Sequence, residues 1–136
     1  MGEFKPPERY KMRVLLAEDE PDIRLITRLS LEDAGYDVTL VGDGQAAVAA
    51  AQHSAFDVVL LDVMMPLMDG FAACRQLKAD AHTRSLPVIF LTAKSQEAEV
   101  HQGLALGAIG YIIKPFDVFE LAHQIESLLA RSDPRA

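Results

Sequence analysis

From Arg13 to about Arg131, short apolar runs alternate with longer stretches in which apolar residues recur every three or four positions. Runs that are apolar on consecutive residues are typical of strands covered on both faces of a sheet. Their alternation with amphipathic helices predicts an open parallel sheet with helices on both faces, which is a doubly wound α/β fold. The five expected strands are residues 13–17, 37–41, 57–61, 87–91 and 111–114.

Five helices are expected between and after these strands. The first begins near Pro21 and stops at Gly35, because glycine is favoured just beyond a helix C-terminus. The second follows Asp43-Gly44 and the third follows Asp69-Gly70. All three stretches lie between predicted strands, as the crossover helices of a parallel sheet must.

The last two helices carry clearer patterns. The fourth is expected over about 95–107, with Val100 and Leu104 facing inward. The fifth begins at a capping-box pattern formed by Asp117 and Glu120. Its apolar stripe consists of Val118, Leu121, Ala122, Ile125, Leu128 and Leu129.

These elements predict one domain, over residues 12–131. Residues 1–11 and 132–136 are expected to be tails, the second because Pro134 breaks the last helix. Among doubly wound folds we expect the flavodoxin-like strand order 2-1-3-4-5.

The composition narrows the functional class. The formal net charge is −7 and the basic residues are scattered, which argues against a nucleic-acid-binding surface. No apolar run is long enough to span a bilayer, and the first residues do not form a signal peptide. Cys74 is the only cysteine, so no internal disulfide can form. We therefore expect a cytoplasmic protein without membrane insertion or direct nucleic-acid binding.

Polar side chains stand where four of the predicted strands end. The functional crevice of an open α/β sheet lies outside the carboxyl ends of its strands. In the order 2-1-3-4-5 these four strands are neighbours, and the second strand, which ends in no comparable group, lies at the edge of the sheet. The side chains are Glu18 and Asp19 after the first strand, Asp62 after the third, Thr92 and Lys94 after the fourth, and Lys114 at the end of the fifth.

Each of these residues alone has an ordinary structural interpretation. The acids before Pro21 can cap a helix, Asp62 can form a turn, and Lys114 can be a solvated surface charge. Together, however, they bring three carboxylates to one point, which requires a cation, and such oxygen ligands suit Mg²⁺. A hydroxyl and an ammonium group beside them can bind the remaining oxygens of a transferred phosphoryl group.

Four motifs occur in order at these strand ends: "LLAEDE", "VVLLDVMMPLMDG", "IFLTAK" and "GYIIKPF". Over residues 13–131 the chain therefore resembles the receiver domain of two-component response regulators, the family of the chemotaxis receiver. The resemblance implies that Asp62 accepts a phosphoryl group from the phosphohistidine of a histidine kinase or histidine phosphotransfer protein. It also implies that Glu18, Asp19, Asp62 and the backbone carbonyl of Met64 bind Mg²⁺.

The same resemblance implies a conformational switch. Thr92 and Lys114 are expected to hold the phosphoryl oxygens, next to a cis bond between Lys114 and Pro115. When Thr92 is drawn in, the ring of Tyr111 follows, and the face of the fourth helix, fifth strand and fifth helix changes shape. That face is the expected surface for a target protein or a homodimer, and it carries Glu97, Glu99, His101, Gln102, His123 and Glu126.

Two residues depart from the chemotaxis receiver. Met64 stands two residues after Asp62, where a polar side chain can place attacking water, and Lys94 stands two residues after Thr92. Because methionine cannot orient water, we expect slow loss of the phosphoryl group. The acidic pair is Glu-Asp instead of the commoner Asp-Asp, a conservative change.

Other functional classes remain open at this stage. A phosphohydrolase with an aspartate nucleophile commonly carries a second Asp where this chain has Met64. A flavodoxin-like cofactor binder requires a glycine-rich phosphate loop, but "EDEPD" follows the first strand. A receiver-like scaffold that takes no phosphate, or a receiver excised from a longer regulator or hybrid kinase, also fits. The leading expectation is a signalling module that is not an enzyme beyond its own phosphorylation and dephosphorylation.

Overall fold

The computed structural model of the chain describes residues 11–132, except for the side chain of Lys94. Most of the expected N-terminal tail, and the expected break at Pro134, lie outside the described residues. In chain order the elements are β1 (Arg13–Ala17), α1 (Pro21–Asp33), β2 (Asp37–Val41), α2 (Gly44–His53), β3 (Val58–Asp62), α3 (Gly70–Ala79), β4 (Val88–Ala93), α4 (Glu97–Gly103), β5 (Gly110–Lys114) and α5 (Leu121–Ser132).

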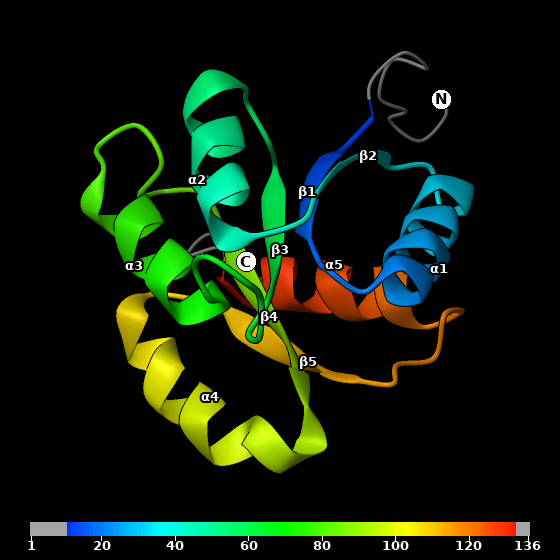
Figure 1. The fold of residues 1–136 in the computed structure, drawn as a ribbon. Coiled ribbons are helices and arrows are strands. Elements are labelled where there is room, and N and C mark those ends of the chain that lie inside the picture. The colour runs from blue at the N-terminus through cyan, green and yellow to red at the C-terminus, as the bar shows by residue number, and fades with distance from the viewer. Residues whose placement is uncertain (1–10, 133–136) are drawn as a thin grey trace.

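The five strands form one parallel sheet in the order β2-β1-β3-β4-β5, as predicted from the sequence. Figure 1 shows α1 and α5 on one face of this sheet and α2, α3 and α4 on the other. The register aligns the strand ends, because Asp62 lies opposite Leu91 and Thr92 lies opposite Ile113. Residues that end neighbouring strands therefore meet at one edge of the sheet.

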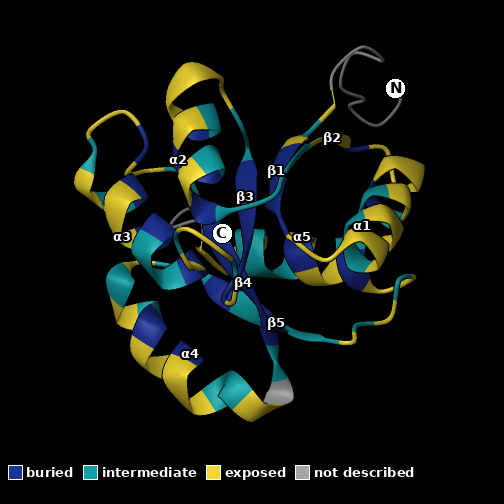
Figure 2. Ribbon diagram, viewed as in Figure 1, coloured by how far each residue is buried: buried dark blue, intermediate teal, exposed yellow. Residues whose placement is uncertain are grey.

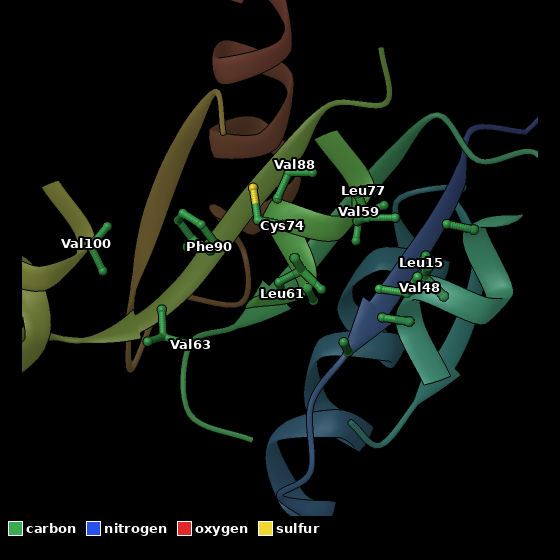
Figure 3. Packing of buried hydrophobic residues seen from close by; sticks show 14 residues of the cluster. Leu15, Val48, Val59, Leu61, Val63, Cys74, Leu77, Val88, Phe90 and Val100 are labelled. Atoms are coloured by element: carbon green, nitrogen blue, oxygen red, sulfur yellow. The ribbon is translucent and has the colours of Figure 1, made fainter. Parts of the chain in front are cut away.

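Two hydrophobic cores cover the sheet, one on each face. Alternate residues of a strand point to opposite faces, so Leu15 packs in one core and Leu16 in the other. Every residue of β3 is buried, which explains its unbroken apolar run (Figure 2). Cys74 lies inside the core between the sheet and α2–α4, and burial raises the pKa of its thiol (Figure 3).

The helix ends in the structure can be compared with those predicted from the sequence. Gly35 follows α1 with a φ of 97°, the left-handed conformation expected beyond the C-terminus. The expected fourth helix is divided, because α4 ends at Gly103 and is flanked by 3₁₀ turns at Lys94–Gln96 and Leu104–Leu106. Gly107, with a φ of 109°, follows the second turn. Val100 is buried as predicted.

The fifth helix begins three residues later than the capping-box pattern predicts. Asp117 caps a turn, because its carboxylate accepts a hydrogen bond from the Phe119 N–H at 2.8 Å, and the Glu120 N–H bonds to the Asp117 carbonyl at 2.9 Å. The helix proper begins at Leu121. The carbonyl of Val118, which lies in this turn, accepts a hydrogen bond from the Ser30 hydroxyl of α1. Within residues 11–132, none of the helices is both long and apolar enough to cross a bilayer.

Candidate functional site

Three acidic side chains converge where β1 and β3 end. Glu18 and Asp19 follow β1, and Asp62 is the last residue of β3. One carboxylate oxygen from each lies within 4.8 Å of the others. Glu18 is fully buried and Asp62 is 4% exposed, whereas Asp19 is exposed to solvent. The sequence-predicted acidic cluster is therefore present in the structure.

Lys114 reaches this cluster from the end of β5. Its Nζ atom lies 3.1 Å from Oε1 of Glu18 and 3.1 Å from Oδ2 of Asp62. The second carboxylate oxygen of Glu18 accepts a hydrogen bond from the Glu20 N–H at 3.1 Å. The Lys114–Pro115 peptide bond is cis, as the resemblance implies. One ammonium group thus pairs with two carboxylates at once.

The electrostatics of the pocket follow from this crowding. Burial raises the pKa of Glu18 from 4.5 to about 7, and the nearby Asp62 adds to the rise. Burial acts to lower the pKa of Lys114, but the charges of Asp62 and Glu18 outweigh it and raise the pKa above its usual value. The carboxylates outnumber the ammonium group, so the pocket carries excess negative charge when all of them are ionised.

The loop from β3 to α3 fixes the surroundings of Asp62. The N–H of Met64 donates to Oδ1 of Asp62 at 3.2 Å, and the Met64 side chain is 63% exposed. A Cβ atom on Gly70 would collide with the Asp62 carbonyl oxygen, and the Gly70 N–H bonds to the Val63 carbonyl at 3.0 Å. Glycine at this position therefore lets the loop fold back closely against the end of β3. Within the loop, Leu67 takes a left-handed φ of 66°.

The two residues of the expected switch lie on adjacent strands. Thr92 is fully buried, and its hydroxyl donates to the Ala93 carbonyl at 3.2 Å. No hydrogen bond joins Thr92 to the acidic cluster among the described residues. The Tyr111 hydroxyl is turned toward α4, 3.2 Å from Oε2 of Glu97 and 3.3 Å from Nε2 of His101.

The donor set of the pocket fits a magnesium ion. Mg²⁺ prefers hard oxygen ligands and is usually held by one or two carboxylates together with water and phosphate oxygens. Glu18, Asp19 and Asp62 offer such oxygens within one small volume, and the exposure of Asp19 leaves an open side for water. Histidine and cysteine ligands, which zinc prefers, are absent from this described cluster.

A groove beside the pocket was missed by the sequence analysis, which gave α1 a structural role only. The groove has a volume of about 340 Å³ and borders the acidic pocket through Lys114. Apolar residues of α1 and of the segment after β5 line it, including Ile23, Ile26 and Pro115. Ile26 is apolar but 50% exposed. An apolar residue outside the buried side of α1 was therefore the one signal that could have indicated this groove.

Comparison with known proteins agrees with this arrangement. Residues 14–126 match the family model described as the response regulator receiver domain. The chain is 40% identical over 121 residues to the DNA-binding dual master transcriptional regulator RpaA of Synechocystis, covering 89% of this chain and 50% of that protein. It is 38% identical to the transcriptional regulatory protein RprY of Bacteroides fragilis, again over 89% of this chain and 50% of the relative. The chain thus spans about half the length of the curated relatives it matches.

Solved structures agree on the fold. The chemotaxis response regulator CheY4 of Vibrio cholerae matches with a TM-score of 0.82 and 33% identity, over 88% of this chain and 99% of that one. The receiver domain of the sensor histidine kinase PA1611 from Pseudomonas aeruginosa, which has a magnesium ion in its active site cleft, matches with a TM-score of 0.81 and 33% identity, over 89% and 99% of the two chains. With its sheet order, its acidic pocket and these matches, this chain belongs to the response regulator receiver domain family.

Proposed function

We propose that Asp62 accepts a phosphoryl group, in the presence of Mg²⁺, from the phosphohistidine of a histidine kinase or histidine phosphotransfer protein. The observation that carries this proposal is the convergence of Glu18, Asp19, Asp62 and Lys114 at the end of the sheet. A carboxylate nucleophile, oxygen ligands for a divalent cation and an ammonium group are what phosphoryl transfer to an aspartate requires.

The proposed reaction is an in-line displacement at phosphorus. A carboxylate oxygen of Asp62 attacks the phosphorus atom while the P–N bond to the donor imidazole breaks. The imidazole nitrogen keeps the electron pair and takes up a proton from solvent, and Asp62 becomes an acyl phosphate. Glu18, Asp19, Asp62 and the carbonyl of Met64 would hold Mg²⁺, which would supply charge neutralisation at the phosphoryl oxygens.

Lys114 and Thr92 would stabilise the product. Lys114 now donates to Oδ2 of Asp62, and the same ammonium group can transfer its ion pair to a phosphoryl oxygen once that carboxylate oxygen is esterified. The Thr92 hydroxyl, which now donates to the Ala93 carbonyl, would leave that carbonyl and donate to a second phosphoryl oxygen. Thr92 lies near the end of β4, which neighbours β3 in the sheet, and Lys114 ends β5, the next strand beyond β4.

The groove beside Lys114 suggests how a protein donor docks. A donor histidine must come within bonding distance of Asp62, so the surface next to the pocket has to contact the donor. The groove lined by Ile23, Ile26 and Pro115 is continuous with the pocket through Lys114. Its apolar lining suits the apolar face of a helix that carries the phosphohistidine.

We further propose that phosphorylation changes the face formed by α4, β5 and α5. Thr92 and Tyr111 lie on adjacent strands, so a movement of the Thr92 side chain changes the space available to the Tyr111 ring. The altered face would then bind a target protein or a second copy of the chain. This proposal concerns the receiver domain and includes no direct contact with nucleic acid.

The proposal is tested by intact mass measurement after incubation with acetyl phosphate. We expect a gain of one phosphoryl group that requires Mg²⁺ and is absent from an Asp62→Ala variant. Glu120→Ala is the matched control, because it removes an exposed carboxylate that is not part of the acidic cluster. If the wild-type chain gains no mass from acetyl phosphate or from a phosphorylated histidine donor, the chain is a receiver-like scaffold that acts without phosphate.

A further inference from the structure

The Tyr111 hydroxyl is held between two side chains of α4. It lies 3.2 Å from Oε2 of Glu97 and 3.3 Å from Nε2 of His101. The His101 and Tyr111 rings also meet edge to face, with centroids 5.4 Å apart and an interplanar angle of 78°. Glu97 and His101 are four residues apart on one helix, so they share a face and reach the same hydroxyl.

The chemistry of the three groups fixes the direction of their hydrogen bonds. An ionised carboxylate can only accept, so the Tyr111 hydroxyl donates its single proton to Glu97. The Tyr111 oxygen then accepts, and the hydrogen on Nε2 of His101 is the donor. Burial and the hydrogen bond to Glu97 both raise the pKa of Tyr111, so its hydroxyl keeps this proton.

The helix that supplies these two partners is itself anchored. Val100, between them in the sequence, is fully buried in the core next to the sheet. At the end of α4 a Cβ atom on Gly103 would collide with the Phe71 ring, which also packs edge to face on Phe90 at 5.1 Å. Glu97 and His101 are therefore presented to Tyr111 from a packed element of the fold.

We propose that Glu97 and His101 are positioning residues that hold Tyr111 in its present orientation and so oppose the switch. The proposal rests on the proposed function, in which the ring moves after phosphorylation. Moving the ring breaks both hydrogen bonds, so their strength adds to the free energy that a bound phosphoryl group must supply. Removing either partner makes the phosphorylated conformation easier to reach.

The test is the affinity of the chain for beryllium trifluoride, a phosphoryl analogue, measured by titration with Mg²⁺ at one fixed pH. Glu97→Ala and His101→Ala should each bind the analogue roughly two- to tenfold more tightly, as expected for the loss of one opposing hydrogen bond. Glu97→Gln keeps an acceptor and His101→Gln keeps an N–H donor, so both should stay close to the wild-type affinity. Glu99→Ala removes an exposed carboxylate from the same helix and serves as the matched control.

A double-mutant cycle separates positioning from a general loosening of α4. In a Tyr111→Phe background the ring remains but the hydroxyl is gone, so Glu97→Ala, which removes only a partner of the hydroxyl, should have no further effect. The proposal would be overturned if the substitution raised the affinity for beryllium trifluoride equally in the Tyr111→Phe and wild-type backgrounds, or if it left the affinity unchanged in the wild-type background. Either result would leave the phosphoacceptor function intact. A wild-type chain that binds neither the analogue nor a phosphoryl group would overturn both.

Discussion

At the scale of single residues, Glu18 is the least ordinary feature of the pocket. Its carboxylate is fully buried beside a second carboxylate and shares one ammonium group with it. A buried acid is costly to ionise unless a cation compensates the charge. The raised pKa of Glu18 expresses that cost, and a divalent cation in the pocket would remove it.

Without Mg²⁺, this pKa makes stability depend on pH. Between pH 4.5 and about 7 the folded chain keeps a proton on Glu18 that the unfolded chain has lost. The contribution of Glu18 to the free energy of unfolding is therefore fully present below pH 4.5 and is lost as the pH rises through about 7, by at most about 3 kcal/mol. Urea unfolding in a chelating buffer should show this decline.

Glu18→Gln is the matched variant, because it keeps the shape and the hydrogen-bond acceptor but cannot titrate. Its free energy of unfolding should be flatter over the same pH range. Parallel curves for the variant and the wild-type chain would show that Glu18 keeps an ordinary pKa in the folded state.

Met64 bears on the lifetime of the phosphoryl group. Its apolar side chain is 63% exposed, and it stands two residues after Asp62 in the sequence. Water that attacks the acyl phosphate finds no polar side chain at this position. Met64→Asn should shorten the lifetime of phosphorylated Asp62 several-fold, as measured by the decay of the phosphorylated mass after removal of the donor. An unchanged lifetime would contradict this role for Met64.

The sequence predicted which side chains form the pocket, but not the contacts that they make with one another. The spacing of the four motifs located the acids, the threonine and the lysine at strand ends. It did not show that Lys114 bonds to Glu18 as well as Asp62, because side-chain reach depends on how far apart β1, β3 and β5 end. For the same reason, the contact of Tyr111 with Glu97 and His101 could not be derived from the sequence.

At the scale of elements, α1 and the segment after β5 line the proposed donor surface, and this segment and α5 are bonded to the region of α1. The Ser30 hydroxyl of α1 donates to the Val118 carbonyl ahead of α5, and the Tyr36 hydroxyl donates to Glu126 of α5 at 2.9 Å. These bonds position the segment after β5, including Pro115, against α1. The groove is therefore part of the packed fold.

A substitution in α1 should slow phosphoryl transfer from a histidine donor protein without slowing transfer from acetyl phosphate. Ile26→Asp places a charge in the groove and should slow phosphoryl transfer from a histidine donor protein by about tenfold or more, equivalent to about 1.4 kcal/mol. Labelling by acetyl phosphate, which needs no docking, should be unchanged. Leu25→Asp is the matched control, since Leu25 is 48% exposed on the same helix and does not line the groove. Equal slowing by both variants, or by neither, would exclude the groove as the docking surface.

The strands were more predictable than the helix ends. Each strand begins within one residue of its predicted start, because a run of consecutive apolar residues has a sharp boundary. The helices depended on local capping chemistry that the pattern did not resolve. Asp117 and Glu120 match a capping box, yet Asp117 caps a turn whose conformation also satisfies the bond from Ser30 to Val118. Tertiary contacts decided where α5 begins.

At the scale of the whole molecule, the sheet order makes the site. The order β2-β1-β3-β4-β5 places the strands that carry Glu18, Asp62, Thr92 and Lys114 next to one another and leaves β2 at the edge. The alternation of apolar runs predicted a parallel sheet with helices on both faces. The order itself was expected because it is a common one for doubly wound folds and makes neighbours of the four strands with polar ends. The two cores hold the strand ends in register.

Mg²⁺ should stabilise the whole fold if it binds this pocket. A ligand that binds only the folded state at ten times its dissociation constant raises the free energy of unfolding by about 1.4 kcal/mol. Asp19→Asn should abolish most of this gain and should leave stability without Mg²⁺ nearly unchanged, because Asp19 is exposed. Thermal unfolding with and without Mg²⁺ provides the measurement. An equal gain in the variant would place the ion elsewhere.

The most direct test of the account is to locate the phosphoryl group on the chain. Borohydride reduces an acyl phosphate of aspartate to homoserine, so reduction after labelling with acetyl phosphate and Mg²⁺ marks the acceptor permanently. Tandem mass spectrometry of the digested chain should then find homoserine at position 62 and at no other aspartate. Homoserine at another position, such as Asp19, or a labelled chain without any homoserine, would contradict the assignment of Asp62 as the phosphoacceptor.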